Sequence, residues 1–209
     1  GVSVCDFFNM PAQRLAAITG IRSDYFSDEK RSTALELAKR EADFIADSRV
    51  KPVFYTDRDY PTRMAECGDA PAMLYVAGNN EAARASCSVA IVGTRHCTPY
   101  GADFTRRLVS ELASTLDGSL LIVSGLAFGV DIAAHRAALE AGVPTAAVLA
   151  HGLNTIYPAD HRNEAKRIIS DGGFLATEYR SSDRIHRGNF LARNRLIAAL
   201  ADVTVVVES

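Results

Sequence analysis

The segment that best indicates the fold of this chain is 120–131, with the sequence Leu-Leu-Ile-Val-Ser-Gly-Leu-Ala-Phe-Gly-Val-Asp. Its first four residues are apolar without interruption, and a turn with Gly125 and Gly129 separates them from Asp131, where a helical pattern opens. A strand that is covered on both faces needs such an unbroken apolar run, because neither face meets water. The segment therefore predicts a buried strand, a glycine turn and a helix, in that order.

The same order repeats along the chain. Apolar runs lie at 89–92, 120–123, 145–149, 173–177 and 203–207, and helical patterns lie between them at 102–115, 131–141, 160–170 and 190–201. Strands that alternate with crossover helices form a parallel sheet with helices on both faces. We therefore predict an α/β fold with an extended Rossmann-like, doubly wound and mostly parallel sheet.

The residues before this repeat follow different patterns. Residues 10–48 carry apolar side chains at helical spacing and are punctuated at Gly20 and Ser32, which predicts two or three short helices. Residues 50–78 hold two short β runs among turn residues, which we expect to be edge strands.

The composition is that of a globular protein: 48% of the 209 residues are hydrophobic, 23% are charged, and the net charge is −2. We expect two domains, a small N-terminal helical domain over residues 1–48 and an extended Rossmann-like domain over residues 49–209. The first residue is glycine rather than methionine and the last residues read as a strand, so we expect both ends to be trimmed and a C-terminal portion to be missing.

No membrane segment or disulfide framework is expected. The longest uncharged stretch, 141–159, contains glycine, proline, His151 and Asn154, which would break and hydrate a spanning helix. The cysteines form no Cys-x-x-Cys pair and no secretory signal precedes them; they are Cys5, Cys67, Cys87 and Cys97. We therefore expect free thiols and a cytoplasmic protein rather than disulfides or a zinc site.

Positive charge is concentrated in one segment, 180–195, which holds five arginines and Asp183 as its one acidic residue, a balance of +4. Ligands of a doubly wound sheet bind outside the carboxyl ends of the strands, and this segment follows the run at 173–177. Arginine neutralises phosphate, while an aromatic ring such as that of Phe190 stacks on a base of any sequence. The segment therefore favours a polymer of nucleotides as the ligand, although a lone phenylalanine is more often a core residue.

Within this segment Arg193, Asn194 and Arg195 are consecutive, and three consecutive positions cannot share one helical face. We expect at most two of them to reach a common ligand, and the third to pair with an acid or to cap structure.

Two other turns carry candidate ligand groups. After the run at 89–92, Gly93 is followed by Thr94 and Arg95, and these groups with backbone N–H donors could hold a phosphate at the start of the next helix. Gly125 and Gly129 allow either close approach of a ligand or tight packing of strand against helix. Neither turn matches the Gly-x-Gly-x-x-Gly or the Gly-x-x-x-x-Gly-Lys-Ser/Thr pattern, so ATP hydrolysis of that kind is unsupported.

Candidate catalytic groups have simpler explanations. Asp131 and His135 lie four residues apart on one helix, but an N-cap aspartate with a hydrogen-bonded core histidine is the favoured interpretation over a catalytic pair. Glu178 is expected to form a salt bridge with a nearby arginine rather than to act as a base. The histidines show no metal-ligand spacing, so we predict no catalytic residue, no metal and no cofactor.

Several ordered motifs carry a resemblance to a known family. They are Asp59-Tyr60-Pro61, Ala-Pro-Ala-Met-Leu-Tyr-Val-Ala-Gly at 70–78, Ala90-Ile91-Val92-Gly93-Thr94-Arg95, Tyr100-Gly101, Ser-Gly-Leu-Ala-Phe-Gly-Val-Asp-Ile-Ala-Ala-His at 124–135, Tyr157-Pro158 and Phe-Leu-Ala-Arg-Asn-Arg-Leu-Ile at 190–197. From about Lys39 onward the chain resembles the DNA-processing protein A family, also called Smf. It departs from the family pattern at Thr94, where serine is commoner, and at Leu191, where proline is usual.

This resemblance implies a protein that binds single-stranded DNA in a basic pocket at the strand ends during natural transformation. It also implies assembly into homodimers and handover of the strand to the recombinase RecA, with no enzymatic activity. In the implied site Arg187 contacts phosphate, Phe190 stacks on a base and Arg95 anchors the backbone from the other side. The predicted DNA-binding residues are Gly93, Thr94, Arg95, Gly125, Arg187, Phe190, Arg193, Asn194 and Arg195.

Two alternatives stay open. A Rossmann-like nucleotide phosphoribohydrolase acting on nucleoside monophosphates would use the same glycines and arginines, with Glu178 as its base, although the Pro-Gly-Gly-x-Gly-Thr run of those enzymes is not found. A purely structural interaction module would share the fold but would not need concentrated arginine.

Overall fold

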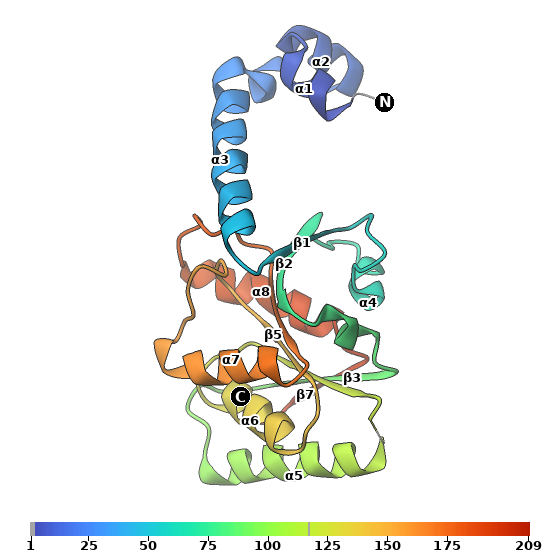
Figure 1. Ribbon diagram of the computed structural model, residues 1–209, viewed down its shortest axis with the longest axis vertical. Helices are drawn as coiled ribbons and strands as arrows, with labels where there is room; N and C mark the ends of the chain where they lie inside the picture. Colours follow the sequence, from blue (N-terminus) through green and yellow to red (C-terminus); the bar gives the residue numbers. More distant parts are fainter. Residues whose placement is uncertain (1–2, 117) are drawn as a thin grey trace. The chain divides into compact units, whose positions relative to one another are not determined.

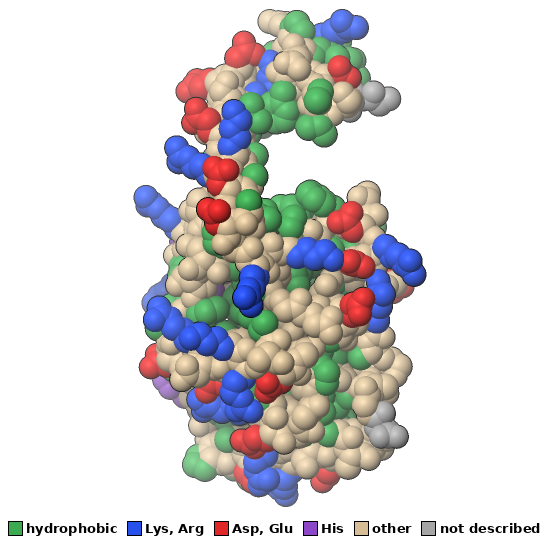
Figure 2. Space-filling view, in the orientation of Figure 1, with side chains coloured by type: hydrophobic (Ala, Val, Ile, Leu, Met, Phe, Trp, Pro, Cys, Tyr) green, Lys and Arg blue, Asp and Glu red, His purple; other side chains and the backbone are tan. Residues whose placement is uncertain are grey.

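The computed structural model describes residues 3–116 and 118–209 (Figure 1). The chain divides into two compact units, Gly1–Asp47 and Ser48–Ser209. On the face shown in Figure 2, basic and acidic side chains are interspersed, in keeping with the small net charge. None of the helices among the described residues is long and apolar enough to cross a membrane.

The first unit is helical. It contains α1 (Val4–Asn9), α2 (Ala12–Thr19), the 3-10 turn η1 (Ser23–Phe26) and α3 (Asp28–Asp47). Leu15 and Phe26 are buried, and the buried Arg31 donates hydrogen bonds to the carbonyl oxygens of Phe7 and Met10. The expectation of short helices is wrong for α3, which has 20 residues, because no glycine or proline interrupts it and Ser32 lies inside it.

The second unit is built on a sheet that has seven strands within the described residues, in the order β1-β2-β6-β5-β4-β3-β7. The strands are β1 (Lys51–Phe54), β2 (Met73–Gly78), β3 (Cys87–Val92), β4 (Leu120–Ser124), β5 (Thr145–Val148), β6 (Phe174–Thr177) and β7 (Val203–Val206). Strands β3 to β7 pair in parallel, whereas β1 and β2 add an antiparallel extension beside β6. The predicted fold class is confirmed.

Helices cover both faces of this sheet. The principal helices are α5 (Pro99–Thr115), α6 (Val130–Glu140), α7 (Arg162–Ser170) and α8 (Arg187–Ala199), with short turns at α4 (Thr62–Ala65), η2 (Asn80–Arg84) and η3 (Ala159–His161). Side chains alternate along the strands: Leu121 and Val123 pack with α8, whereas Ile122 packs with α5 and α6. This alternation explains why the central runs are apolar at every position.

Strand β7 departs from the sequence prediction. The run at 203–207 was expected to be covered on both faces, but Val203 is 57% exposed and Val206 is 61% exposed. Within the described residues, the strand lies at the edge of the sheet and pairs only with β3. Val205 and Val207 share one face of the strand and pack against the core beside α5, whereas Val206 on the opposite face is exposed. Val203 lies on the packed face but is exposed at the start of the strand.

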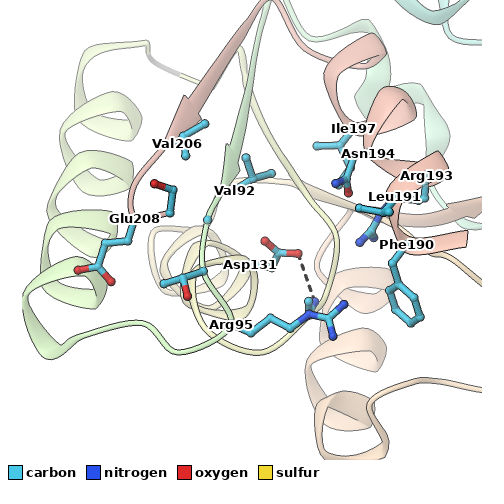
Figure 3. Close-up of a pocket in the computed structure, with 14 residues that line it drawn as sticks. Val92, Arg95, Asp131, Phe190, Leu191, Arg193, Asn194, Ile197, Val206 and Glu208 are labelled. Carbon is cyan, nitrogen blue, oxygen red and sulfur yellow. Dashed lines mark hydrogen bonds between the residues drawn. The ribbon is translucent and has the colours of Figure 1, made fainter. Parts of the chain in front are cut away.

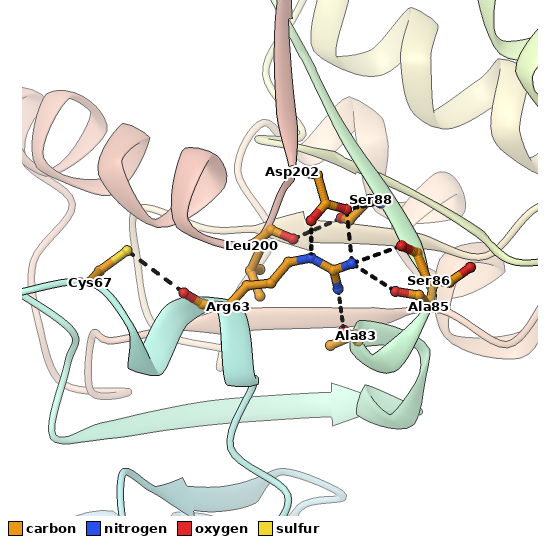
Figure 4. Close-up of polar contacts among 8 residues, drawn as sticks. All are labelled: Arg63, Cys67, Ala83, Ala85, Ser86, Ser88, Leu200 and Asp202. Carbon is orange, nitrogen blue, oxygen red and sulfur yellow. Dashed lines mark hydrogen bonds and ion pairs between the residues drawn. The ribbon is translucent and has the colours of Figure 1, made fainter.

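One arginine ties the extension to the rest of the sheet (Figure 4). From α4, Arg63 donates two hydrogen bonds to the carboxylate of Asp202, at 2.7 and 2.8 Å, and others to three carbonyl oxygens of segment 83–86. The same carboxylate accepts the Ser88 N–H at 2.8 Å. These hydrogen bonds lower the pKa of Asp202, and those from Arg63 have the largest effect. They also connect α4 to the first residues of β3 and to the residue before β7.

Candidate functional site

A hollow of about 360 Å³ opens at the carboxyl ends of the parallel strands (Figure 3). The turn after β3 contributes Thr94 and Arg95, the first turn of α6 contributes Asp131, and α8 contributes Phe190 and Asn194. This is where a doubly wound sheet binds its ligands, since the loops on this edge are free of the packing between sheet and helices.

The rim of the hollow is cationic and aromatic. The guanidinium carbon of Arg95 lies 5.1 Å from the ring centroid of Phe190, so two segments 95 residues apart in sequence meet here. Arg184 and Arg187 precede Phe190 in the same segment and are exposed, but they are not among the residues that line the hollow. No ion pair or hydrogen bond involves either guanidinium group within the described part of the chain. Arg187 is the first residue of α8 rather than a loop residue, because His186 caps the helix by accepting the Gly188 N–H.

Arg193 lies beneath the hollow and is 3% exposed. Its guanidinium donates to the carbonyl oxygen of Gly125 at 2.8 Å and to that of Val148, at the ends of β4 and β5. A Cβ atom on residue 125 would lie 2.6 Å from the guanidinium carbon, so the glycine makes room for this arginine rather than for a ligand. We therefore infer that Arg193 and Gly125 build the floor of the hollow, and their predicted contact with the ligand stays a prediction.

Arg195 is bound to acidic neighbours. Its Nη2 lies 2.5 Å from Glu178 Oε2, and its Nη1 donates to the carbonyl oxygen of Asp69 at 3.0 Å. The salt bridge expected for Glu178 is confirmed. Arg195 is not among the residues that line the hollow. Asn194 is the exposed member of the consecutive trio and lines the hollow, as the geometry of one helical face requires.

The expected phosphate site at the start of α5 is filled by the protein itself. The Glu208 carboxylate accepts the Thr98 backbone N–H at 2.9 Å and the Thr98 hydroxyl at 2.5 Å, which lowers the pKa of Glu208. The Thr94 hydroxyl accepts the His96 N–H at 3.2 Å and so supports its own turn. The expectation of an open anion site at this helix is wrong, because Glu208 already serves as the anion.

The glycines of the two turns are packing residues. A Cβ atom on Gly93 would lie 2.8 Å from the Glu208 carbonyl oxygen. Gly129 has φ of 79°, and its Cβ atom would lie 2.8 Å from the Arg95 Cα. The tight-packing explanation therefore accounts for Gly93, Gly125 and Gly129, and their smallness lets the turns after β3 and β4 touch.

Asp131 and His135 form a buried support rather than a reactive pair. The N-cap of α6 is Gly129, so the expectation of an N-cap at Asp131 is wrong; its carboxylate accepts the Ala127 N–H at 3.4 Å from inside the first turn. Burial raises the pKa of Asp131, while the nearby Arg193 opposes that rise. No group of three His, Cys, Asp or Glu side chains in the described segments is placed to hold a metal ion.

His135 is fully buried and neutral. The Thr145 hydroxyl donates to the Ile122 carbonyl at 2.8 Å, so its oxygen accepts from His135 Nδ1, also at 2.8 Å. Nε2 then carries no proton, and no partner for it exists among the described residues. Burial lowers the pKa of His135 to about 3.

Two exposed aromatic residues beside the rim were not predicted as site residues. Tyr157 packs edge-on against Phe190, with ring centroids 5.9 Å apart, and Phe128 packs edge-on against the buried His161 at 4.9 Å. Both belong to motifs noted in the sequence, but neither lies in the arginine-rich segment that guided the prediction. The signal that could have found them is their place after strands, at the same sheet edge.

Fold and site together define a Rossmann-type α/β protein. At the carboxyl edge of its sheet, an arginine and an aromatic side chain line the hollow, instead of a glycine-rich phosphate loop. The family model of DNA recombination-mediator protein A matches residues 51–209. The chain belongs to this family, which confirms the resemblance drawn from its motifs.

Individual relatives agree. The chain is 38% identical over 163 residues to Protein Smf of Synechocystis sp., which covers 76% of this chain and 40% of Smf. It is 43% identical over 151 residues to a putative DNA processing protein DprA of Mycobacterium tuberculosis, covering 70% of this chain and 37% of the relative. The chain thus spans about two fifths of the length of these curated relatives.

Solved structures are similar too. The X-ray structure of DNA processing protein A from Streptococcus pneumoniae superposes with a TM-score of 0.77 at 32% identity, covering 93% of this chain and 65% of that one. A structure of the Helicobacter pylori protein, described for its unique single-stranded DNA binding mode, gives 0.65 at 34% identity, covering 76% and 68%.

Proposed function

We propose that this chain binds single-stranded DNA at the rim of the hollow and serves DNA processing in recombination. One observation carries the proposal: Arg95 and Phe190 converge from separate segments at the carboxyl edge of the sheet, with the exposed Arg187 on the same helix as Phe190. Guanidinium groups neutralise phosphates, and an aromatic ring stacks on any base, so the pair suits a flexible single strand.

The roles divide along the rim. Arg187 and Arg95 contact phosphates, and Phe190 stacks on a base. Asn194 and Thr94 line the hollow beside them and can donate hydrogen bonds to the strand. Membership in the family, together with the DNA-binding relative from Helicobacter pylori, supports this assignment.

Further properties concern the whole protein, and we propose them from family membership. The protein forms homodimers in the cytoplasm and passes its strand to RecA, without chemistry of its own. The phosphoribohydrolase alternative would need Glu178 as a base, and that carboxylate is held by Arg195. Incubation with nucleoside monophosphates and detection of released base would test that alternative.

The proposal is tested by titrating a labelled oligothymidine and a matched duplex at two salt concentrations. We expect preference for the single strand, and a logarithmic fall of affinity with salt of about 0.7 for each phosphate contact. Equal affinity for the duplex, or no association with the oligothymidine, would contradict the proposal.

A further inference from the structure

The Arg95–Phe190 pair forms a partition between two hollows. The larger hollow, of about 360 Å³, lies on the side of Asn194, and a smaller one, of about 30 Å³, lies on the side of Tyr157. Arg95 and Phe190 line both. The binding edge therefore continues past Phe190, onto a surface to which the proposed function gives no role.

Tyr157 dominates that surface. Its side chain is 48% exposed, and its hydroxyl has no hydrogen-bond partner in the part of the chain that the structure describes. Its backbone is held firmly, because its N–H donates to Nε2 of the buried His151 at 3.2 Å, while His151 Nδ1 lies 2.9 Å from the Gly152 carbonyl oxygen. Because its backbone is already fixed, the Tyr157 side chain loses little conformational entropy when a flat ligand stacks on its half-exposed ring.

The two rings face different directions. The planes of Tyr157 and Phe190 are inclined at 63°, with centroids 5.9 Å apart. Stacked bases in a duplex follow one another at about 3.4 Å along each strand, so bases on these two rings cannot remain stacked on each other. The smaller hollow cannot enclose a base, so a base on this side must lie on the outer face of the Tyr157 ring.

Positive charge lies along the same path. The Asn189 side chain donates to the carbonyl oxygens of Ala150 and Arg184, at 3.2 and 3.3 Å. These bonds hold the segment that carries Arg184 against the turn after β5, which leads to His151 and Tyr157. The phosphate of a nucleotide on Tyr157 would therefore have a cationic segment beside it.

We propose that Tyr157 is a second base-stacking platform, which holds the base next to the one on Phe190, and that the strand bends between the two rings. This proposal rests on the proposed function, because it assumes that a single strand occupies the rim. It assigns the ligand of the exposed Tyr157 ring face as a nucleobase of the same strand.

The absence of tryptophan from the sequence makes a direct test available. Single tryptophans introduced as Tyr157→Trp and Phe190→Trp report on stacking, because a base stacked on an indole quenches its emission. Tyr100→Trp is the matched control, since Tyr100 is 72% exposed but lines neither hollow. Each variant is titrated with labelled oligothymidine while tryptophan emission and label anisotropy are recorded together.

We expect emission to fall in step with anisotropy for Tyr157→Trp and Phe190→Trp, and to stay constant for Tyr100→Trp. Binding without quenching at position 157 would overturn the second platform, whatever happens at position 190. Absence of an anisotropy change in the wild type would instead refute the proposed function, so the two failures are distinguishable.

Affinity supplies an independent readout. We expect Tyr157→Ala to weaken oligothymidine binding about tenfold, within the range measured for one stacked base, and Tyr157→Phe to retain it. Equal affinity of Tyr157→Ala and the wild type would overturn the proposal.

Discussion

The rim and the floor of the site use the same kind of residue for opposite purposes. Helix α8 carries Arg187 at its exposed first position and the buried Arg193 less than two turns later. The Arg187 guanidinium has no protein partner among the described residues, whereas the Arg193 guanidinium is buried and donates through Nη1 to the carbonyl oxygens of Gly125 and Val148. Arginine content therefore does not measure binding capacity; the number of guanidinium groups that are both exposed and free of protein partners does.

The floor also explains how the rim is kept in place. Arg193 joins α8 to the ends of β4 and β5, and Asp131 supplies the opposite charge from α6. A buried guanidinium is tolerated only where carbonyl oxygens and a carboxylate compensate its lost hydration. Phe190 and Asn194 are thus mounted on a helix that is fixed from below.

The largest effect should come from breaking the floor. Arg193→Ala leaves two buried carbonyl oxygens without their donor and removes the positive charge that favours the ionised Asp131 carboxylate, which should lower the free energy of unfolding by about 3–5 kcal/mol. Arg187→Ala, on the same helix, should change it by less than about 0.5 kcal/mol. Urea unfolding of both variants measures this difference. Equal free energies of unfolding would contradict the assignment of Arg193 to a structural role and of Arg187 to the surface.

A smaller loss is expected from Gly125→Ala. The added methyl group would press on the Arg193 guanidinium, and such overpacking typically costs about 1–3 kcal/mol. Gly68→Ala is the matched control, because nothing lies within 4 Å of its Cβ position. Thermal or urea unfolding should rank Gly125→Ala well below Gly68→Ala; if the two were alike, the glycine would not be serving Arg193.

The floor should also respond to pH through His135. The pKa of His135 is about 3 in the folded chain and about 6.5 in the unfolded chain. Between these two pH values the unfolded chain binds one more proton than the folded chain, so the free energy of unfolding falls as the pH is lowered. Between pH 6 and pH 5 the loss should be about 1 kcal/mol.

The variant His135→Asn, which keeps an N–H donor but does not titrate, isolates this effect. Asp131 acts in the opposite sense, since its pKa is raised, so the difference between wild type and variant is the quantity to measure. A difference that does not change with pH would show that His135 is not held neutral.

Substitutions at the rim should have smaller effects, and these effects should be on the affinity for DNA rather than on the free energy of unfolding. Arg95→Ala and Arg187→Ala should each weaken oligothymidine binding several-fold at constant salt, because each removes a phosphate contact. Arg195→Ala serves as the control, since its guanidinium is engaged by Glu178, and it should change affinity less than about twofold. Anisotropy titrations compare the three, and a loss at Arg195 equal to that at Arg187 would contradict the assignment.

The sequence predicted the sheet well because buried parallel strands are apolar at every position, and segment 120–131 showed this directly. The prediction of burial was wrong for β7, which has an equally apolar sequence but lies at an exposed edge of the sheet. A local sequence pattern does not determine the order of the strands in the sheet. The length of α3 was predictable from its lack of helix breakers, and the weak punctuation at Ser32 was misleading.

The site was less predictable, because pairing depends on distant residues. The balance of +4 counted over 180–195 is reduced by the carboxylate of Asp69, which pairs with Arg195 from 126 positions away. The Glu208 carboxylate binds Thr98, the N-cap of α5, from 110 positions away. One local signal was available: Arg193 lies on the helical stripe of Leu196, Ile197 and Leu200, all buried. That spacing already places Arg193 on the core face.

The central claim is that the rim arginines, and not those bound within the protein, neutralise the phosphates of a single strand. The most direct test is the slope of the logarithm of oligothymidine affinity against the logarithm of salt concentration. The double variant Arg95→Ala/Arg187→Ala should lower the magnitude of this slope by about 1.4, corresponding to two phosphates, while Arg195→Ala should leave it as in the wild type. An unaltered slope in the double variant, or an equal reduction in Arg195→Ala, would contradict the claim.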